Sequence, residues 1–252
     1  FGVFEAEVFS RDRLDLSYLN PVILYRYVES SRGSADNAMV GLDVKVNFLS
    51  HFLVYSQLML DEFKLNELRA GEGSWVNKFA WQIGAKYIDA FDLQAELNLA
   101  RPYTYSHEKS NTVSAGQTNY ANYSQPLAHP LGANFVETLG IVRYQRKRLF
   151  ATGIFGVMTY GTDPSPGFNY GGNILKDYNS LFREEGNFIG QGRKNVVTYA
   201  DLRGSYMIRH NIFLEGRLLY RYQDSQARDD TYSSQVASVA LRWNLPYRNW
   251  VF

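Results

Sequence analysis

The chain has 252 residues, with 26 basic side chains, 25 acidic side chains and no cysteine. The near-neutral charge argues against a nucleic-acid partner held by phosphate contacts, and the lack of cysteine excludes disulfides, thiol chemistry and cysteine-based zinc sites. No apolar run approaches the roughly 18 to 20 residues that a membrane-spanning helix needs. Aromatic residues make up 15% of the chain and punctuate short alternating runs, which favours an all-β fold.

Alternation of apolar and polar residues with a period of two recurs along the chain and predicts β-strands. In the segment Met39–Phe48, for example, Val40 and Leu42 fall on one face, whereas Asp43 and Lys45 fall on the other. The same pattern predicts eleven strands, at Phe1–Phe9, Val22–Glu29, Met39–Phe48, His51–Phe63, Lys78–Asp89, Asp92–Leu99, Ala133–Tyr144, Arg148–Tyr160, Val196–Arg209, Ile212–Tyr222 and Gln235–Leu245.

The connections between the predicted strands are of two kinds. Short turns are expected at Leu49–His51, Ala90–Asp92, Gln145–Lys147 and Arg209–Asn211. Long polar loops are expected at Ser30–Asn37, Lys64–Val76, Ser106–Asn134, Gly161–Asn195 and Asp224–Ser234. From the second strand onward the two kinds alternate, which is typical of outer-membrane barrels with short periplasmic turns and long extracellular loops. We therefore predict one domain over residues 1–252, an antiparallel transmembrane β-barrel of the bacterial outer membrane, with a soluble all-β domain as the alternative.

Aromatic residues near the expected strand ends support the membrane interpretation, because outer-membrane barrels carry aromatic girdles at both interfaces. The girdle candidates are Trp75, Trp81, Tyr87, Tyr103, Tyr160, Tyr220, Tyr222, Trp243 and Trp250.

The parity of eleven strands bears on completeness. If the last strand ends in the periplasm, counting back places Phe1 outside the cell, whereas single-chain bacterial barrels usually have an even number of strands and periplasmic termini. We therefore expect at least one strand to be missing upstream, so that the chain is the C-terminal part of a larger barrel. The end of the chain, Trp250-Val251-Phe252, resembles the terminal signal read by outer-membrane assembly machinery.

Five segments resemble one group of proteins, the Bacteroidetes outer-membrane proteins of the Wzi (capsule assembly) and RemB (gliding motility) type. The segments are LNPVILYR at Leu19–Arg26 with Glu29, NAMVGLD at Asn37–Asp43, QLMLDEF at Gln57–Phe63, RPYTYSH at Arg101–His107 and QPLAHPLGANF at Gln125–Phe135. The resemblance covers about residues 19 to 135 and extends to the later half only in general character. It implies a barrel of about eighteen strands and a role with surface polysaccharide or motility-associated surface machinery.

The loop Ser106–Asn134 and the strand end before it hold the candidate ligand-binding residues. Aromatic faces stack on the C–H surfaces of sugars, and amide, hydroxyl and guanidinium groups hydrogen-bond to sugar hydroxyls or carboxylates. The candidates for glycan binding are Arg101, Tyr103, Tyr105, His107, Tyr120, Tyr123, Gln125 and His129. The alternative is that the tyrosines belong to the girdle and the amides to a solvated loop that caps the barrel.

Charged residues also occur within the predicted strands, and most can face the lumen. They are Asp61, Glu62, Glu96, Arg101, Glu137, Arg143, Arg203, Glu215, Arg217, Arg221 and Arg242. Their mixed signs favour cross-strand ladders that fill or narrow the lumen, and a selective pore is the alternative.

No enzyme is expected. The neighbouring carboxylates Asp61 and Glu62 should point to opposite faces of a strand, so they cannot act on one sugar, and Glu184-Glu185 and Asp229-Asp230 fall in loops. No Gly-x-Ser-x-Gly elbow or complete phosphate loop occurs. His107 and His129 with Glu108 could hold a metal ion only if the loop folded back, and we predict neither a metal nor a cofactor.

The sequence thus predicts an outer-membrane barrel that binds or helps assemble surface polysaccharide, or supports gliding and surface machinery, through its extracellular loops. A passive porin is the alternative, and an outer-membrane hydrolase is a weaker one. The expected partners are outer-membrane lipid and lipopolysaccharide, surface polysaccharide, and motility or secretion proteins.

Overall fold

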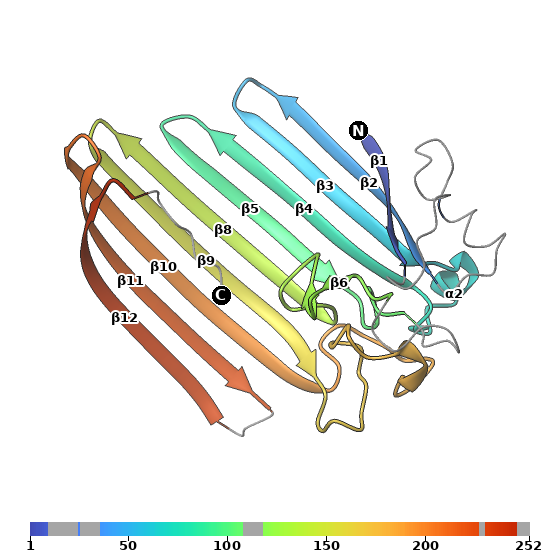
Figure 1. The fold of residues 1–252 in the computed structure, drawn as a ribbon. Helices are drawn as coiled ribbons and strands as arrows, with labels where there is room; N and C mark the ends of the chain where they lie inside the picture. Colours follow the sequence, from blue (N-terminus) through green and yellow to red (C-terminus); the bar gives the residue numbers. More distant parts are fainter. Residues whose placement is uncertain (10–24, 26–35, 108–117, 227–229, 246–252) are drawn as a thin grey trace.

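A computed structural model describes residues 1–9, 25, 36–107, 118–226 and 230–245 of the chain. These residues form one antiparallel sheet of ten strands with almost no helix (Figure 1). The strands are β1 (Gly2–Val8), β2 (Asn37–Phe48), β3 (Phe52–Glu62), β4 (Lys78–Ile88), β5 (Phe91–Ala100), β8 (Phe135–Arg146), β9 (Leu149–Thr162), β10 (Arg193–Arg209), β11 (Ile212–Ser225) and β12 (Asp230–Trp243). The prediction of an all-β chain is therefore confirmed.

Neighbours in the sheet are neighbours in the chain, so the sheet is a meander in the order β1-β2-β3-β4-β5-β8-β9-β10-β11-β12. Tight turns such as Leu49–His51 and Lys147–Arg148 join strands at one end of the sheet, and the long connections lie at the other end. The long connections contain the helix α2 (Leu65–Ala70), the short hairpin of β6 (Ala121–Asn122) and β7 (Gln125–Pro126), and the 3-10 turn η2 (Tyr178–Ser180). The predicted alternation of short and long connections is confirmed from β2 to β11. The predicted long loop Asp224–Ser234 is wrong, because β11 continues to Ser225 and β12 begins at Asp230, so that residues 226–229 join the two strands.

The start of the sheet differs from the prediction. The predicted strand Val22–Glu29 lies outside the described residues except for Tyr25, and β1 pairs directly with β2, with Val8 opposite Asn37. Because β1 is antiparallel to β2, the start of β1 lies toward the end of the sheet that carries the tight turns. The parity argument, which placed Phe1 at the opposite end, was therefore wrong.

The two faces of the sheet differ sharply in chemistry. One face, here called the apolar face, carries alternate residues such as Leu42, Val44, Phe155, Leu218 and Leu241, and each of these side chains is exposed. Between the strand ends, the apolar face of β2–β5 and β8–β12 carries no charged side chain. Large exposed apolar surfaces of this kind mark contact with lipid or with another protein.

Strand β1 is the exception on this face. Its Glu5 and Glu7 follow the parity of the apolar face, and the Oε2 atom of Glu5 accepts a hydrogen bond from the backbone N–H of Tyr25 at 3.0 Å. The charge-free part of the apolar face therefore begins at β2 and does not include β1.

The predicted girdle residues are divided between the two faces and the connections. Trp81, Tyr220, Tyr222 and Trp243 are exposed on the apolar face, and Tyr87 follows the same alternation. Three candidates lie elsewhere. Trp75 packs in a connection with its ring centre 4.9 Å from that of Tyr178, Tyr103 is buried, and Tyr160 alternates onto the opposite face. Trp250 lies outside the described residues.

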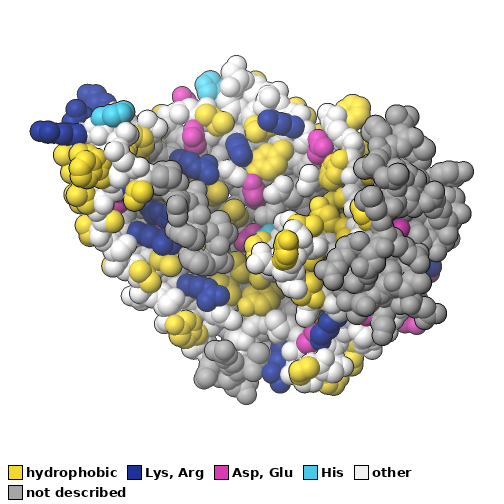
Figure 2. Space-filling model, viewed as in Figure 1, with side chains coloured by type: hydrophobic (Ala, Val, Ile, Leu, Met, Phe, Trp, Pro, Cys, Tyr) yellow, Lys and Arg dark blue, Asp and Glu magenta, His cyan; other side chains and the backbone are white. Residues whose placement is uncertain are grey.

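The opposite face, here called the polar face, holds most of the charged and amide side chains of the strands. In Figure 1 the sheet curves, and segments of the long connections lie over this face; Figure 2 shows Lys, Arg, Asp and Glu side chains in the hollow that it forms. Two glycines let tyrosine rings lie flat on this face. A Cβ atom at Gly84 would meet the ring of Tyr55 at 2.4 Å, and one at Gly156 would meet the ring of Tyr199 at 2.4 Å.

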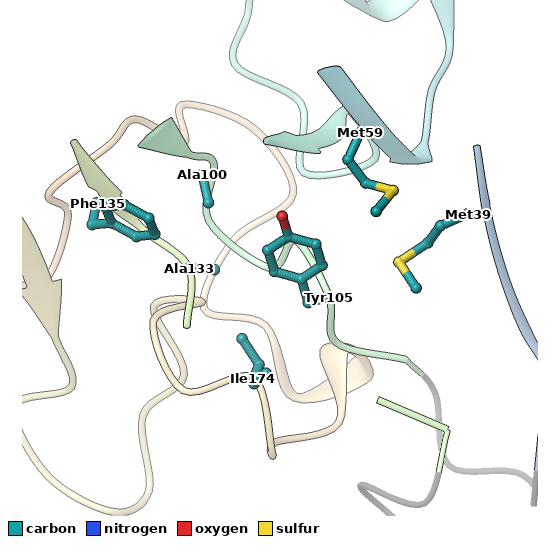
Figure 3. Close-up of a cluster of buried hydrophobic side chains, with 7 residues drawn as sticks. All are labelled: Met39, Met59, Ala100, Tyr105, Ala133, Phe135 and Ile174. Carbon is teal, nitrogen blue, oxygen red and sulfur yellow. The ribbon is translucent and has the colours of Figure 1, made fainter. Parts of the chain in front are cut away.

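A cluster of buried apolar side chains lies at the end of the sheet where the long connections fold back. Its members are Met39, Met59, Ala100, Tyr105, Ala133, Phe135 and Ile174 (Figure 3). Four of them come from strands and three from the connections. Hydrophobic burial in this cluster therefore holds the connections on the polar face of the sheet. It does not join two sheets, as it would in a β-sandwich. Among the described residues, no helix is long and apolar enough to cross a membrane.

Candidate functional site

The best candidate site is a cavity of about 380 Å³ between the polar face and the connection that follows β5. Strands β1, β3, β4 and β5 provide one wall. The other wall is formed by Tyr105, Tyr120, Leu127, Ala128, His129 and Phe135. Its volume is within the range of small-ligand pockets. Amide and imidazole side chains line it together with aromatic rings, which suits a hydroxyl-rich ligand better than a hydrocarbon.

Two tyrosines form the aromatic side of the cavity. The rings of Tyr105 and Tyr120 are stacked with centres 5.6 Å apart, and the backbone N–H of Tyr120 donates to the carbonyl of Tyr105 at 2.9 Å. The backbone N–H of Tyr105 donates to Oδ2 of the buried Asp61 at 2.7 Å. Burial raises the pKa of the Tyr105 phenol, with the nearby Asp61 carboxylate as a further cause, so the hydroxyl stays protonated at neutral pH.

A histidine and a glutamate form the next part of the wall. The ring of His129 is stacked on Phe135 with centres 4.2 Å apart, and its Nε2 atom lies 3.3 Å from Oε2 of Glu137. The Nδ1 atom accepts the backbone N–H of Leu131 at 3.2 Å, which assigns the ring proton to Nε2. His129 therefore donates to Glu137, and Asn98 donates to the same oxygen at 3.3 Å.

Amide side chains line the sheet side of the cavity. Gln57 and Gln82 are directly opposite each other on β3 and β4, and Asn98 is directly opposite Gln82 on β5. Below them, Glu96 accepts from Tyr55, from Gln94 and from Gln82. The cavity thus offers amides, a phenol and an imidazole, and its nearby carboxylates are already hydrogen-bonded.

A buried lysine holds the connection on the sheet. The Nζ atom of Lys78 lies 3.4 Å from Oδ1 of Asp61 and 3.2 Å from Oε1 of Glu62, and it donates to the carbonyl of Ser106 at 3.0 Å. It also lies 4.5 Å from the ring centre of Tyr178. Lys78 therefore joins β3 and β4 to two separate connections.

This cluster corrects one prediction. Asp61 and Glu62 were expected to point to opposite faces, but a register shift between Leu60 and Glu62 brings both carboxylates to Lys78. A bulge of this kind breaks the strict alternation of a strand. The pair still does not form a glycosidase site, because Asp61 is buried and both carboxylates are paired with one ammonium group.

A second anchor is the buried Asn134, whose backbone lies in the left-handed region at φ 58°. Its Oδ1 atom accepts from the backbone N–H groups of Gly190 and Gln191, at 2.7 and 3.2 Å. Its Nδ2 atom donates to the carbonyls of Gly161 and Gln191, at 3.3 and 2.9 Å. One side chain therefore ties the connection after β5 to the connection after β9.

Three of the eight predicted ligand-binding residues meet at the cavity: Tyr105, Tyr120 and His129. Three others support the connections. Arg101 donates to the carbonyl of Ser74 at 3.3 Å, the Tyr103 hydroxyl donates to the carbonyl of Asn169 at 2.9 Å, and the His107 ring lies edge-on to Tyr178.

The last two predicted residues lie in the β6–β7 hairpin. Tyr123 is 93% exposed with a left-handed backbone at φ 48°, and Gln125 is also exposed. Neither lines the cavity.

The cavity is also lined by residues that were not predicted from the sequence: the amides Gln57, Gln82 and Asn98 and the aromatic residue Phe4. All four are strand residues on the polar face, so only the register of four strands places them together. A usable signal was present: each amide stands at a polar position of an alternating strand.

No group of three or more His, Asp or Glu side chains within the described parts of the chain could hold a metal ion. His107 and His129 have different neighbours, and Glu108 lies outside the described residues. Comparison with protein-family models, with curated proteins and with solved structures finds no match.

Proposed function

We propose that the chain forms part of the wall of an outer-membrane β-barrel and binds surface polysaccharide in the cavity under the connection after β5. The membrane part of the proposal is supported by the apolar face, which is exposed and free of charge between the strand ends in nine neighbouring strands. Closure of the barrel would involve β1 and β12, the two edges of the described sheet, which are not paired with each other.

The observation that carries the binding proposal is the composition of the cavity. Two stacked tyrosines, a row of amides and a histidine line the same cavity. Aromatic rings cover the apolar face of a sugar, and amides exchange hydrogen bonds with its hydroxyls. The resemblance to Wzi-type and RemB-type proteins points in the same direction.

Binding is tested with the full chain purified in detergent and with surface polysaccharide extracted from its own host. Tyr120→Ala removes one stacked ring, and we expect a loss of affinity of about tenfold, the size of an aromatic contact. Tyr123→Ala is the matched control, because Tyr123 is exposed outside the cavity. Absence of binding by the unsubstituted chain, or equal losses in both variants, refutes the glycan site and directs attention to motility or secretion proteins.

The membrane location has its own test. Leu218 is 60% exposed on the apolar face, and arginine there should destabilise the protein folded in lipid vesicles by about 2 to 4 kcal/mol if it lies near the bilayer midplane. Gln223→Arg on the polar face of the same strand is the control and should change stability far less. Equal effects at the two positions contradict a lipid-facing surface.

A passive porin is the second candidate, and the charged and amide side chains of the polar face support it, because the lumen of a porin is polar. Cross-strand ion pairs join Arg217 to Asp201 at 2.9 Å and Arg242 to Glu215 at 2.7 Å, as expected of a lumen wall. Single-channel conductance in planar bilayers separates the two candidates, because a barrel filled by its connections should be silent.

A further inference from the structure

The two sides of the polar face differ in charge. Between the tight turns and the level of Tyr199, the polar face of β10–β12 carries four arginines and two carboxylates, an excess of two positive charges. We call these arginines the arginine strip; they are Arg203, Arg217, Arg221 and Arg242. At similar levels, the polar face of β2–β5 carries the carboxylates of Asp43, Asp92 and Glu96 against the amines of Lys45 and Lys86. In Figure 2, dark blue side chains gather over β10–β12.

Strand pairing places two arginines of the strip next to each other. Arg203 and Arg217 are directly opposite each other on β10 and β11, an arrangement that costs free energy unless a counter-charge is present. Asp201 supplies that charge: its Oδ2 atom lies 2.6 Å from Nη2 of Arg203, and its Oδ1 atom lies 2.9 Å from Nε of Arg217. One carboxylate thus serves two guanidinium groups, and the cluster keeps a net positive charge.

The other members extend the charge along the strands. Arg242 is paired with Glu215 and lies 4.0 Å from the ring centre of Phe213. Arg221 is half-buried on β11 and makes no ion pair with the described residues. A purely structural ladder would match its charges, so the excess of positive charge favours an anionic ligand.

The strip is also continuous with the candidate cavity. Tyr199 is directly opposite Arg221 in the sheet, and its side chain is hydrogen-bonded to Glu137, which is bound in turn to His129 of the cavity. A chain-like ligand in the cavity can therefore reach the strip along the polar face.

We propose that the arginine strip binds anionic groups, namely the carboxylates, sulfates or phosphates of an extended polymer. Guanidinium groups present paired N–H donors that match these planar or tetrahedral anions. The identification of the polymer as a polysaccharide rests on the proposed function, whereas anion binding by the strip does not.

The test measures binding of three probes to the full chain in detergent: polygalacturonate, neutral dextran of similar length and inorganic triphosphate. We expect saturable binding of polygalacturonate that weakens with added salt, and much weaker binding of dextran. Arg221→Gln should reduce the affinity for polygalacturonate about fivefold, and Arg221→Glu should reduce it further. Neither substitution touches the Asp201 pairs, so both variants should keep the folded structure.

Lys45→Gln is the matched control, because Lys45 is an exposed amine on the polar face of β2 beside Asp43. Loss of affinity in the Arg221 variants alone supports the strip. Tighter binding of polygalacturonate than of triphosphate supports a sugar-borne anion, and the reverse order with the same dependence on Arg221 supports a phosphate-bearing ligand. Equal losses in the Lys45 and Arg221 variants, or equal binding of dextran and polygalacturonate, overturn the proposal.

Loss of anion binding at the arginine strip and loss of glycan binding in the cavity can be distinguished. Tyr120→Ala should weaken binding of the host polysaccharide and leave triphosphate binding unchanged, because Tyr120 belongs to the cavity. Arg221→Gln should weaken triphosphate binding regardless of which glycan fits the cavity.

Discussion

Replacement of Lys78 by methionine should destabilise the protein strongly. The Lys78 side chain is fully buried, with Asp61 and Glu62 as its ion-pair partners at 3.4 and 3.2 Å. Methionine is similar in length but leaves the buried Asp61 carboxylate without its counter-charge. Removal of one partner from a buried pair costs about 3 to 5 kcal/mol, because the remaining charge stays desolvated. The cost should be near the lower end if Glu62, which is partly exposed, turns toward water.

Urea unfolding of the full chain in detergent micelles, followed by tryptophan fluorescence, measures this effect as a shift of the midpoint at constant slope. Lys45→Met is the matched control and should change the free energy of unfolding by less than about 0.5 kcal/mol, because Lys45 is exposed. The double variant Lys78→Met with Asp61→Asn should recover much of the loss, since it removes the orphaned charge and keeps an acceptor for the Tyr105 N–H. A Lys78→Met variant as stable as the control, or a double variant less stable than the single one, would refute the reasoning.

Three further outcomes follow from the described contacts. Gly84→Val should lower the free energy of unfolding by about 1 to 3 kcal/mol, because the added Cβ would overlap the Tyr55 ring. Gly204→Ala should lower it little, because the added methyl group would meet open space. Thermal unfolding of the two variants compares these effects. Burial raises the pKa of the Tyr103 and Tyr105 phenols, so their ultraviolet tyrosinate signal should appear only above the usual value of about 10, and Tyr105→Phe should reduce the amplitude of the late part of the titration. Because the folded-state pKa of both phenols is raised, their contribution to stability is complete below the ordinary tyrosine pKa and is lost as the pH rises toward the folded-state value; unfolding at several alkaline pH values checks this sign. Asn134→Ala should lower stability by about 1 to 3 kcal/mol, since it leaves the N–H groups of Gly190 and Gln191 without their acceptor, and Asn122→Ala in the exposed hairpin is the control.

The sequence by itself determined the strands and the sides of the sheet. Alternation is a local property with a period of two, so Val40, Leu42 and Val44 could be assigned to one face without knowledge of any neighbour. Turn lengths are local as well, which is why the alternation of short and long connections was predicted correctly from β2 to β11. Cross-strand ion pairs such as that of Arg242 with Glu215 followed from the same alternation, whereas Asp201, the partner of Arg217, was not among the predicted residues.

The tertiary structure alone decided which residues meet. Gln57, Gln82 and Asn98 form one row because the registers of three strands coincide, and register depends on pairing between distant segments. A single bulge brought Asp61 and Glu62 to the same lysine, against the alternation of the strand. In the connection after β5, residue type did not separate Tyr120 from Tyr123, although one lies against the sheet and the other is almost fully exposed. The path of a long connection is set by the core that it buries and by anchors such as Lys78 and Asn134, and these contacts exist only once the sheet has formed.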